Sequence, residues 1–273
     1  MNNHKENEYT IDQLLKRSWT FKNSEEFVKF FTFIAKFEHY SRYNTMLVYI
    51  QNSEITFFGG ISYWKKKFDR EVNCNAKPYI ILAPNGPIMF VYDIMDTEGK
   101  ESPEDFLKKG LGRHVNEVKG KLEKRIYNKV LNQAEMLNIK IFTKPLSYFK
   151  GAYVTNIYSG KLEICLKQGM SREENFSVLI HELAHLFLGH TGHKELIYQG
   201  KKKPIKLLNR KLSKGVKELE AETVSYLISS KLGLETYSIE YLSAYIKDKD
   251  TLLQFDYDTV IKITDKIEGV FIK

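Results

Sequence analysis

The segment Ile180-His181-Glu182-Leu183-Ala184-His185-Leu186 constrains this chain more than any other. Two histidines four residues apart lie one turn above each other on the same face of a helix, so two imidazoles can bind one metal ion. Glu182 follows the first histidine and can reach a metal-bound water as a general base. The pattern predicts a metal site with His181 and His185 as ligands and Glu182 as the catalytic residue.

The residues around this segment favour a helix. Ser171 is suited to the N-cap, and Glu173 and Glu174 fall in the first turn, where the helix dipole favours acidic side chains. Gly189 is a typical stop residue. The apolar residues recur at the spacing of a buried stripe, and they are Phe176, Leu179, Ile180, Leu183, Ala184 and Phe187.

Two histidines are one ligand short of a catalytic zinc site, which commonly takes three protein ligands and leaves one position open. The metzincin class is excluded, because Leu188 and Thr191 stand where that pattern has glycine and histidine. The downstream segment Glu218-Leu219-Glu220-Ala221-Glu222 offers three acidic candidates.

Helical phase separates the three acids. Glu220 falls in line with the apolar residues Val224 and Leu227, whereas Glu218 and Glu222 fall in line with serines. A carboxylate on a buried face needs a partner, and a cation is one. We therefore predict Glu220 as the third zinc ligand, with Glu218 and Glu222 as the alternatives.

Composition restricts the kind of protein. A chain of 273 residues with 42% hydrophobic residues is typical of a folded protein of one large or two small domains. No apolar run approaches the ~20 residues of a membrane span, and the first residues are polar, unlike a signal peptide. Cys74 and Cys165 have no metal-site spacing. We expect a cytoplasmic protein without a membrane part.

Charge is unevenly distributed. Residues 1–112 contain as many acidic as basic residues, so the net charge of +8 belongs to residues 113–273. The stretch from Lys194 to Lys217 is rich in lysine and arginine, with Glu195 as its only acid. It joins the two predicted metal-bearing helices. It is either a solvated loop or a contact for phosphates or an acidic substrate.

Periodicity predicts an α+β fold with two domains, 1–112 and 113–273, separated in a polar segment rich in glycine. The expected elements of the first domain are a helix capped by Ser24, a helix from Asn44, a short helix at 61–68 and a hairpin of strands 79–83 and 88–93. Those of the second are a helix at 115–137, a strand at 140–143, a hairpin of strands 151–155 and 161–166, the two metal-bearing helices, and helices around 239–246 and 259–267.

Together these motifs resemble a known family. His181 to His185, the acidic segment 218–222 and Leu232-Gly233-Leu234 are similar to the ImmA/IrrE-type zinc metallopeptidases, and closest to their branch in ArdC-like antirestriction proteins. The N-terminal half resembles the ArdC N-terminal domain in motifs that follow in order: Tyr43-Asn44, Trp64-Lys65, Asp69 to Val72, Ile81 to Pro84, Val91 to Asp93 and Asp96 to Gly99.

The resemblance implies a single-stranded-DNA-binding domain followed by a zincin-like metallopeptidase domain that binds Zn²⁺ and acts on a protein or peptide. It also implies a gene on a mobile element, whose product protects incoming DNA. Stacking aromatics beside a cationic rim would suit such a domain, although the same aromatics could belong to a core. The predicted nucleic-acid contacts are Arg42, Tyr43, Trp64, Lys65, Lys66, Lys201, Lys202 and Lys203.

Two other functions stay open from the sequence. One is a site-specific protease that cleaves a repressor or regulatory protein, as in the ImmA branch. The other is a DNA-binding module whose zinc is structural and whose chain is not catalytic. Substitution of Glu182 separates them, because only a peptidase depends on that carboxylate.

Overall fold

The computed structural model describes residues 24–37, 39–84, 86–107, 120–145, 152–156, 162–199, 204–234, 246 and 249–272. Within them the chain forms two compact units, one comprising Thr32–Lys119 and the other the residues on either side. The mixture of helices and small sheets is of the α+β class, as expected. The predicted boundary at 112 and 113 lies outside the described residues and stays a prediction. Among the described residues, no helix has the length and apolar character needed to cross a membrane.

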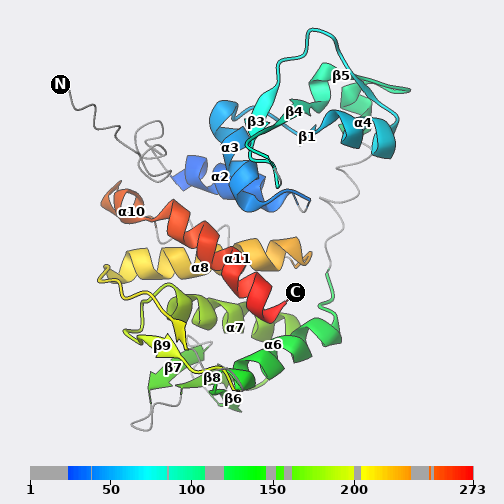
Figure 1. Cartoon of the computed structure of the whole chain (residues 1–273). Helices are drawn as coiled ribbons and strands as arrows, with labels where there is room; N and C mark the ends of the chain where they lie inside the picture. The colour runs from blue at the N-terminus through cyan, green and yellow to red at the C-terminus, as the bar shows by residue number, and fades with distance from the viewer. Residues whose placement is uncertain are drawn as a thin grey trace, which may run out of the picture. The chain divides into compact units, whose positions relative to one another are not determined.

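The unit Thr32–Lys119 is built on a three-stranded antiparallel sheet in the order β1-β4-β3. Helices α3 and α4 and the short pair β2 and β5 accompany it (Figure 1). The elements are α3 (Arg42–Gln51), β1 (Phe58–Gly59), α4 (Ile61–Phe68), β2 (Glu71–Val72), β3 (Tyr79–Ile81), β4 (Met89–Asp93), η1 (Ile94–Asp96) and β5 (Thr97–Glu98). The predicted hairpin and the helix at 61–68 are confirmed.

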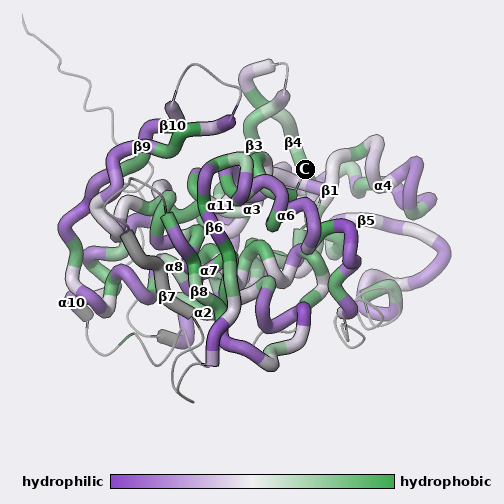
Figure 2. The backbone as a smooth tube through the Cα atoms, turned by 90° about the horizontal axis from the view of Figure 1, so that it is seen from below, coloured by the Kyte–Doolittle hydropathy of each residue, from purple (hydrophilic) through white to green (hydrophobic). Residues whose placement is uncertain are grey.

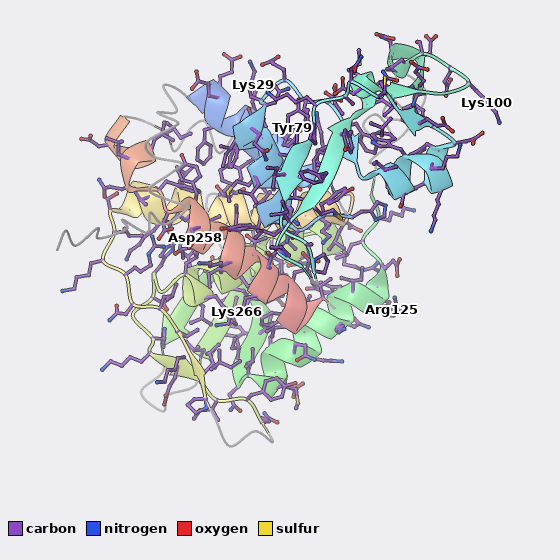
Figure 3. All side chains as sticks on the ribbon, turned by 45° about the horizontal axis from the view of Figure 1, so that its top comes forward. Lys29, Tyr79, Lys100, Arg125, Asp258 and Lys266 are labelled. Atoms are coloured by element: carbon purple, nitrogen blue, oxygen red, sulfur yellow. The ribbon has the colours of Figure 1, made fainter. Side chains whose placement is uncertain are left out.

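Side chains of α3 cover the outer edge of β3. Gln51 accepts from the Ile80 amide and donates to the Ile80 carbonyl, at 2.9 and 2.8 Å. Asn44 forms the same pair of bonds with Leu82. Tyr79, labelled in Figure 3, is buried on β3, and its hydroxyl accepts a hydrogen bond from Asn52 at the end of α3. Satisfying an edge strand with side-chain amides closes it to pairing with another chain.

In the other unit one long helix packs against a mixed sheet and a second long helix packs on the first. Strand β8 lies between β6, to which it is parallel, and β7, to which it is antiparallel. Helix α7 packs on β7 and β8, α8 packs on α7, and α11 packs on both helices (Figure 1). The elements are α6 (Lys124–Met136), β6 (Ile139–Lys144), β7 (Ala152–Asn156), β8 (Leu162–Lys167), α7 (Arg172–Phe187), β9 (Glu195–Leu196), β10 (Ile205–Lys206), α8 (Lys214–Lys231), α10 (Lys249–Gln254) and α11 (Tyr257–Phe271).

The sequence explains this layering. Strand β8 has buried residues on both faces, including Ile164 and Cys165, as a central strand requires. Helix α7 buries its apolar residues and leaves its histidines partly accessible. In Figure 2 the hydrophobic colour follows parts of the strands and helices of this unit, whereas α4 of the other unit is mainly hydrophilic. The predicted antiparallel pairing of 151–155 with 161–166 is confirmed. The helix expected around 239–246 falls almost entirely outside the described residues.

Helix α2 (Ser24–Ala35) begins at the serine predicted to cap it. The boundary between the two units falls within this helix. Its first part packs against the C-terminal residues of the chain, where Phe27 contacts Phe255 at a centroid distance of 5.0 Å. In its last part Phe33 contacts Tyr49 of α3. The helix therefore contributes aromatic residues to both cores.

Candidate metal site

Helix α7 begins and ends as its sequence predicts. Ser171 accepts a hydrogen bond from the Glu174 amide at 3.2 Å, and Glu174 accepts one from the Ser171 amide at 2.7 Å, which is a complete capping box. Gly189 has a φ of +77°, and a Cβ there would come within 2.3 Å of the Leu208 carbonyl oxygen. Only glycine allows this turn, which folds His190 back toward the end of the helix.

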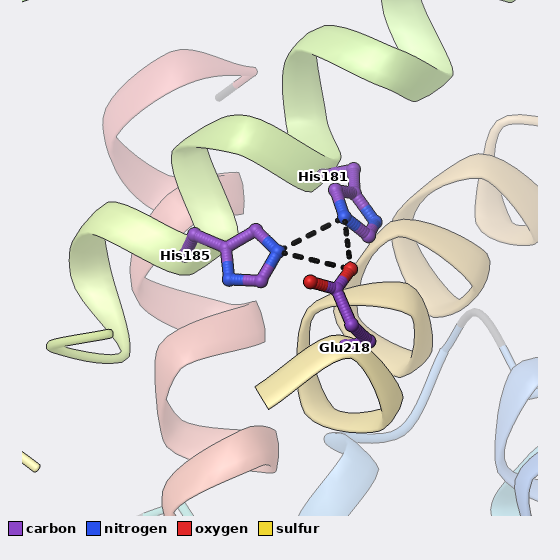
Figure 4. Close-up of side chains that lie close together, drawn as sticks. All are labelled: His181, His185 and Glu218. Atoms are coloured by element: carbon purple, nitrogen blue, oxygen red, sulfur yellow. Dashed lines mark hydrogen bonds and ion pairs between the residues drawn. The ribbon is translucent and has the colours of Figure 1, made fainter. Parts of the chain in front are cut away.

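The structure brings His181, His185 and Glu218 together (Figure 4). The two histidines project from α7, and Glu218 approaches them from α8. The Nε2 atoms of His181 and His185 are 3.0 Å apart, and each lies 3.5 Å from Oε2 of Glu218. Within the described part of the chain, this is the group of histidine and acidic side chains suited to a metal ion.

The third member of this group is Glu218, whereas we predicted Glu220 as the third ligand. Glu220 is fully buried, as its helical phase indicated, but it does not belong to the group around the histidines. Its carboxylate receives two hydrogen bonds from Arg210, at 2.6 and 2.9 Å. The cation that a buried carboxylate needs is therefore a guanidinium group.

Glu218 and Glu222 occupy the polar face of α8, and that face is turned to the histidines rather than to solvent. Glu222 Oε2 lies 2.9 Å from Nδ1 of His181. The acids are spaced i and i+4 on α8, as His181 and His185 are on α7, so the two pairs face each other. This matching spacing was the signal in the sequence that favoured Glu218 over Glu220.

Small polar residues hold the two helices close beside the site. Ser225 of α8 donates to the carbonyl of Ser177 on α7 at 2.9 Å, and the two hydroxyls lie 3.2 Å apart. Ser177 precedes His181 by one helical turn. The contact therefore fixes the spacing between the helices where the site residues meet.

The charges of the site favour a cation. Burial lowers the pKa of His181, but its hydrogen bonds with Glu218 and Glu222 outweigh this effect and raise the pKa to about 10. The same contacts with His181 and His185 hold the pKa of Glu218 well below its ordinary value. Glu182 adds negative charge near His181. A positive charge is thus stabilised where the ligand atoms converge.

Sequence reasoning missed a second set of side chains beside His185. Nδ1 of His185 lies 3.0 Å from Nδ1 of His190, whose Nε2 lies 3.0 Å from Oε2 of Glu220. Arg210 donates to Glu220, and it also donates to Asp256 at a distance of 3.4 Å. Burial lowers the pKa of His190. Nothing in the local pattern of any one of these residues indicates the connection, because they come from separate segments.

The residues that we predicted as nucleic-acid contacts differ in their exposure to solvent. Trp64 is fully buried and donates to the Tyr92 carbonyl at 3.2 Å, so it is a core residue that has no face for a base. Arg42 is only 5% exposed, which removes it from a phosphate-binding surface. Tyr43 is half-buried, and Lys65 and Lys66 are exposed. Lys201, Lys202 and Lys203 lie outside the described residues.

The basic stretch has structural roles at two of its residues. Arg210 pairs with Glu220, and Lys217 donates to the carbonyl of His190 at 3.0 Å. Lys194, Lys206 and Lys214 are exposed. Two of the cationic side chains of this stretch therefore stabilise the surroundings of the candidate metal site.

Comparison with known families agrees with the geometry. Residues 134–223 match the family model of the IrrE N-terminal-like domain, peptidase family M78. This range runs from the end of α6 to the acidic segment of α8 and includes both histidines. No curated protein and no solved structure matches the chain. Within residues 134–223 the chain is therefore similar to the IrrE N-terminal-like domain of peptidase family M78.

Proposed function

We propose that this chain is a zinc-dependent peptidase in which His181, His185 and Glu218 hold the metal ion and Glu182 is the general base. The observation that carries the proposal is the convergence of three ligand atoms from α7 and α8. The family match at residues 134–223 supports the same chemistry.

The three side chains fit zinc. Bonds of 2.0–2.2 Å to nitrogen and oxygen place neighbouring ligand atoms about 3.3–3.6 Å apart in a tetrahedron. The observed separations are 3.0, 3.5 and 3.5 Å. Two imidazoles and one carboxylate form the donor set of a catalytic zinc site, which leaves one position open.

Each residue then has a separate task. A bound zinc ion would supply a Lewis acid that polarises a peptide carbonyl and acidifies water. Glu182 accepts a proton from the attacking water and delivers it to the nitrogen of the leaving amine. Glu222 accepts a hydrogen bond from Nδ1 of His181, which leaves the lone pair of Nε2 directed at the ligand group.

The substrate class we propose is a protein segment in an extended conformation. Strand β7 pairs with β8 on one side and, among the described residues, has no strand on the other. An extended peptide can add to such an edge through main-chain hydrogen bonds. Cleavage of one regulatory protein at one site is the form of this activity that the ImmA/IrrE likeness favours.

A peptide library tests the proposal. The zinc-loaded wild-type protein is expected to cleave members of the library, and Glu182→Gln is expected to keep its zinc and lose at least about 100-fold in rate. Glu195→Gln, at an exposed acid of the same unit, serves as the matched control. Equal cleavage by the Glu182 variant, or none by the zinc-loaded wild type, would leave the zinc with a structural role.

A second function, single-stranded DNA binding in an antirestriction protein of a mobile element, has support from α4. Lys65, Lys66 and Lys67 are exposed in the last turn of this helix, and Tyr63 beside them is half-buried. A cationic rim with an accessible aromatic side chain is suited to single strands. In this second proposal the surface comprises these residues and excludes Arg42 and Trp64.

A further inference from the structure

One ring nitrogen of His185 faces away from the ligand group of His181, His185 and Glu218. Nε2 of His185 faces His181 and Glu218, whereas Nδ1 contacts His190. His190 continues to Glu220, and Glu220 to Arg210. At Nδ1, His181 meets the carboxylate of Glu222 directly, whereas Nδ1 of His185 is connected to a carboxylate through the imidazole of His190.

This row of side chains is enclosed. The side chains of His190 and Glu220 are 1% and 0% exposed, and that of Arg210 is 17% exposed. Glu220 also accepts a hydrogen bond from the amide of Asp256 at 3.1 Å. Main-chain contacts fix His190, whose amide donates to the His185 carbonyl at 2.9 Å. Water therefore has little access to replace these contacts.

The direction of each hydrogen bond in this row follows from the positive charge of Arg210, at the end opposite His185. The guanidinium group of Arg210 donates to both oxygens of the Glu220 carboxylate, which therefore acts as an acceptor. His190 must then donate to Glu220 from Nε2, and a neutral imidazole that donates from Nε2 accepts at Nδ1. His185 must in turn donate from Nδ1, which leaves a lone pair on Nε2.

We propose that His190, Glu220 and Arg210 are positioning residues that orient His185 and fix the tautomer in which its Nε2 binds the metal ion. The inference rests on the proposed zinc site and adds residues to it. None of these three side chains contacts His181 or Glu218 directly. Loss of such a partner commonly lowers metal affinity by about 10–100-fold.

Substitutions at His190 distinguish this role from packing. His190→Phe fills the same space but removes the acceptor, whereas His190→Asn keeps an oxygen near the place of Nδ1 and fills less space. The affinity for zinc, measured by competition with a chelator, should fall about 10–100-fold in the Phe variant and recover largely in the Asn variant. A packing role would give the opposite order.

His193→Phe is the matched control. His193 belongs to the same loop, and its Nδ1 contacts Thr191 rather than a member of the site. Its zinc affinity should equal that of the wild type. Substituting cobalt for zinc adds a spectroscopic measure, since a changed ligand geometry alters the visible absorption of the bound ion in the Phe variant and not in the control.

The wild-type protein allows a test that does not depend on how the variants fold. Nuclear magnetic resonance of the ring nitrogens in the zinc-loaded protein should show His185 protonated at Nδ1 and His190 protonated at Nε2. Zinc binding with the opposite tautomer of His190, or with unchanged affinity in His190→Phe, would overturn the inference and leave the proposed function intact. Absence of zinc binding in the wild type would overturn both.

Discussion

The residues of the candidate metal site show how two acids two positions apart on one helix acquire different roles. Glu218 is half-buried and faces two imidazoles, whereas Glu220 is fully buried and faces a guanidinium group. The partner of each carboxylate, rather than its burial alone, decides what it can bind.

Zinc retention should separate these two acids. Glu218→Gln removes a charged ligand and is expected to lose zinc on dialysis, whereas Glu220→Gln can still accept from His190 and is expected to retain most of its zinc. Elemental analysis of the two purified variants gives the comparison. Loss of zinc from the Glu220 variant together with its retention by the Glu218 variant would restore Glu220 as the ligand.

The pairing of Arg210 with Glu220 also predicts a difference in stability. Arg210→Ala would leave a buried carboxylate without its cation, and breaking such a pair costs about 3–5 kcal/mol. Lys262→Ala is the control, because Lys262 pairs with Asp258 on the exposed surface of α11, where such pairs contribute about 0.3–0.5 kcal/mol. Urea unfolding of the zinc-free proteins measures both, and similar losses in the two variants would contradict the assignment.

At the scale of elements, the helix that carries both histidines depends on its capping box. Removing the hydroxyl in Ser171→Ala should lower the free energy of unfolding by about 1 kcal/mol. The hydrogen bond from the Ser171 amide lowers the pKa of Glu174 below its ordinary value of 4.5. A carboxylate whose pKa is lower in the folded state stabilises that state above its ordinary pKa, and this contribution disappears as the pH falls through the folded value.

The contribution of Glu174 should therefore depend on pH in a defined direction. The stability difference between wild type and Glu174→Gln is expected to be largest near pH 7 and to shrink as the pH falls below 4.5. Urea unfolding at several pH values measures it. A difference that stays constant over that range would show that the carboxylate does not act through this hydrogen bond.

The elements of this chain were predictable where the signal is local. The ends of α7 follow from Ser171 and Gly189, and the pairings of β3 with β4 and of β7 with β8 follow from short apolar runs on either side of turn residues. The role of Glu220 was not predictable, since the phase of a helix shows that a residue is buried but not which cation it meets. Trp64 illustrates the same limit, because a stacking aromatic and a core aromatic have the same pattern in sequence.

At the scale of the whole molecule, we propose a different function for each of the two units. Single-stranded DNA binding by the unit Thr32–Lys119 should depend on α4. Replacing Lys65 and Lys66 with serine should make the salt dependence of binding shallower by about 1.4 units, since each phosphate contact to a single strand contributes about 0.7. Lys124 and Arg125, exposed on α6 of the other unit, provide a control with the same loss of charge. Equal slopes in the two double variants would contradict a binding surface on α4.

Anomalous diffraction at the zinc absorption edge tests most directly whether α7 and α8 hold one metal ion between them. A crystal of the zinc-loaded protein should show one anomalous peak about 2.0–2.2 Å from Nε2 of His181, Nε2 of His185 and a carboxylate oxygen of Glu218. A peak bound by Glu220, or no peak between α7 and α8, would contradict this arrangement.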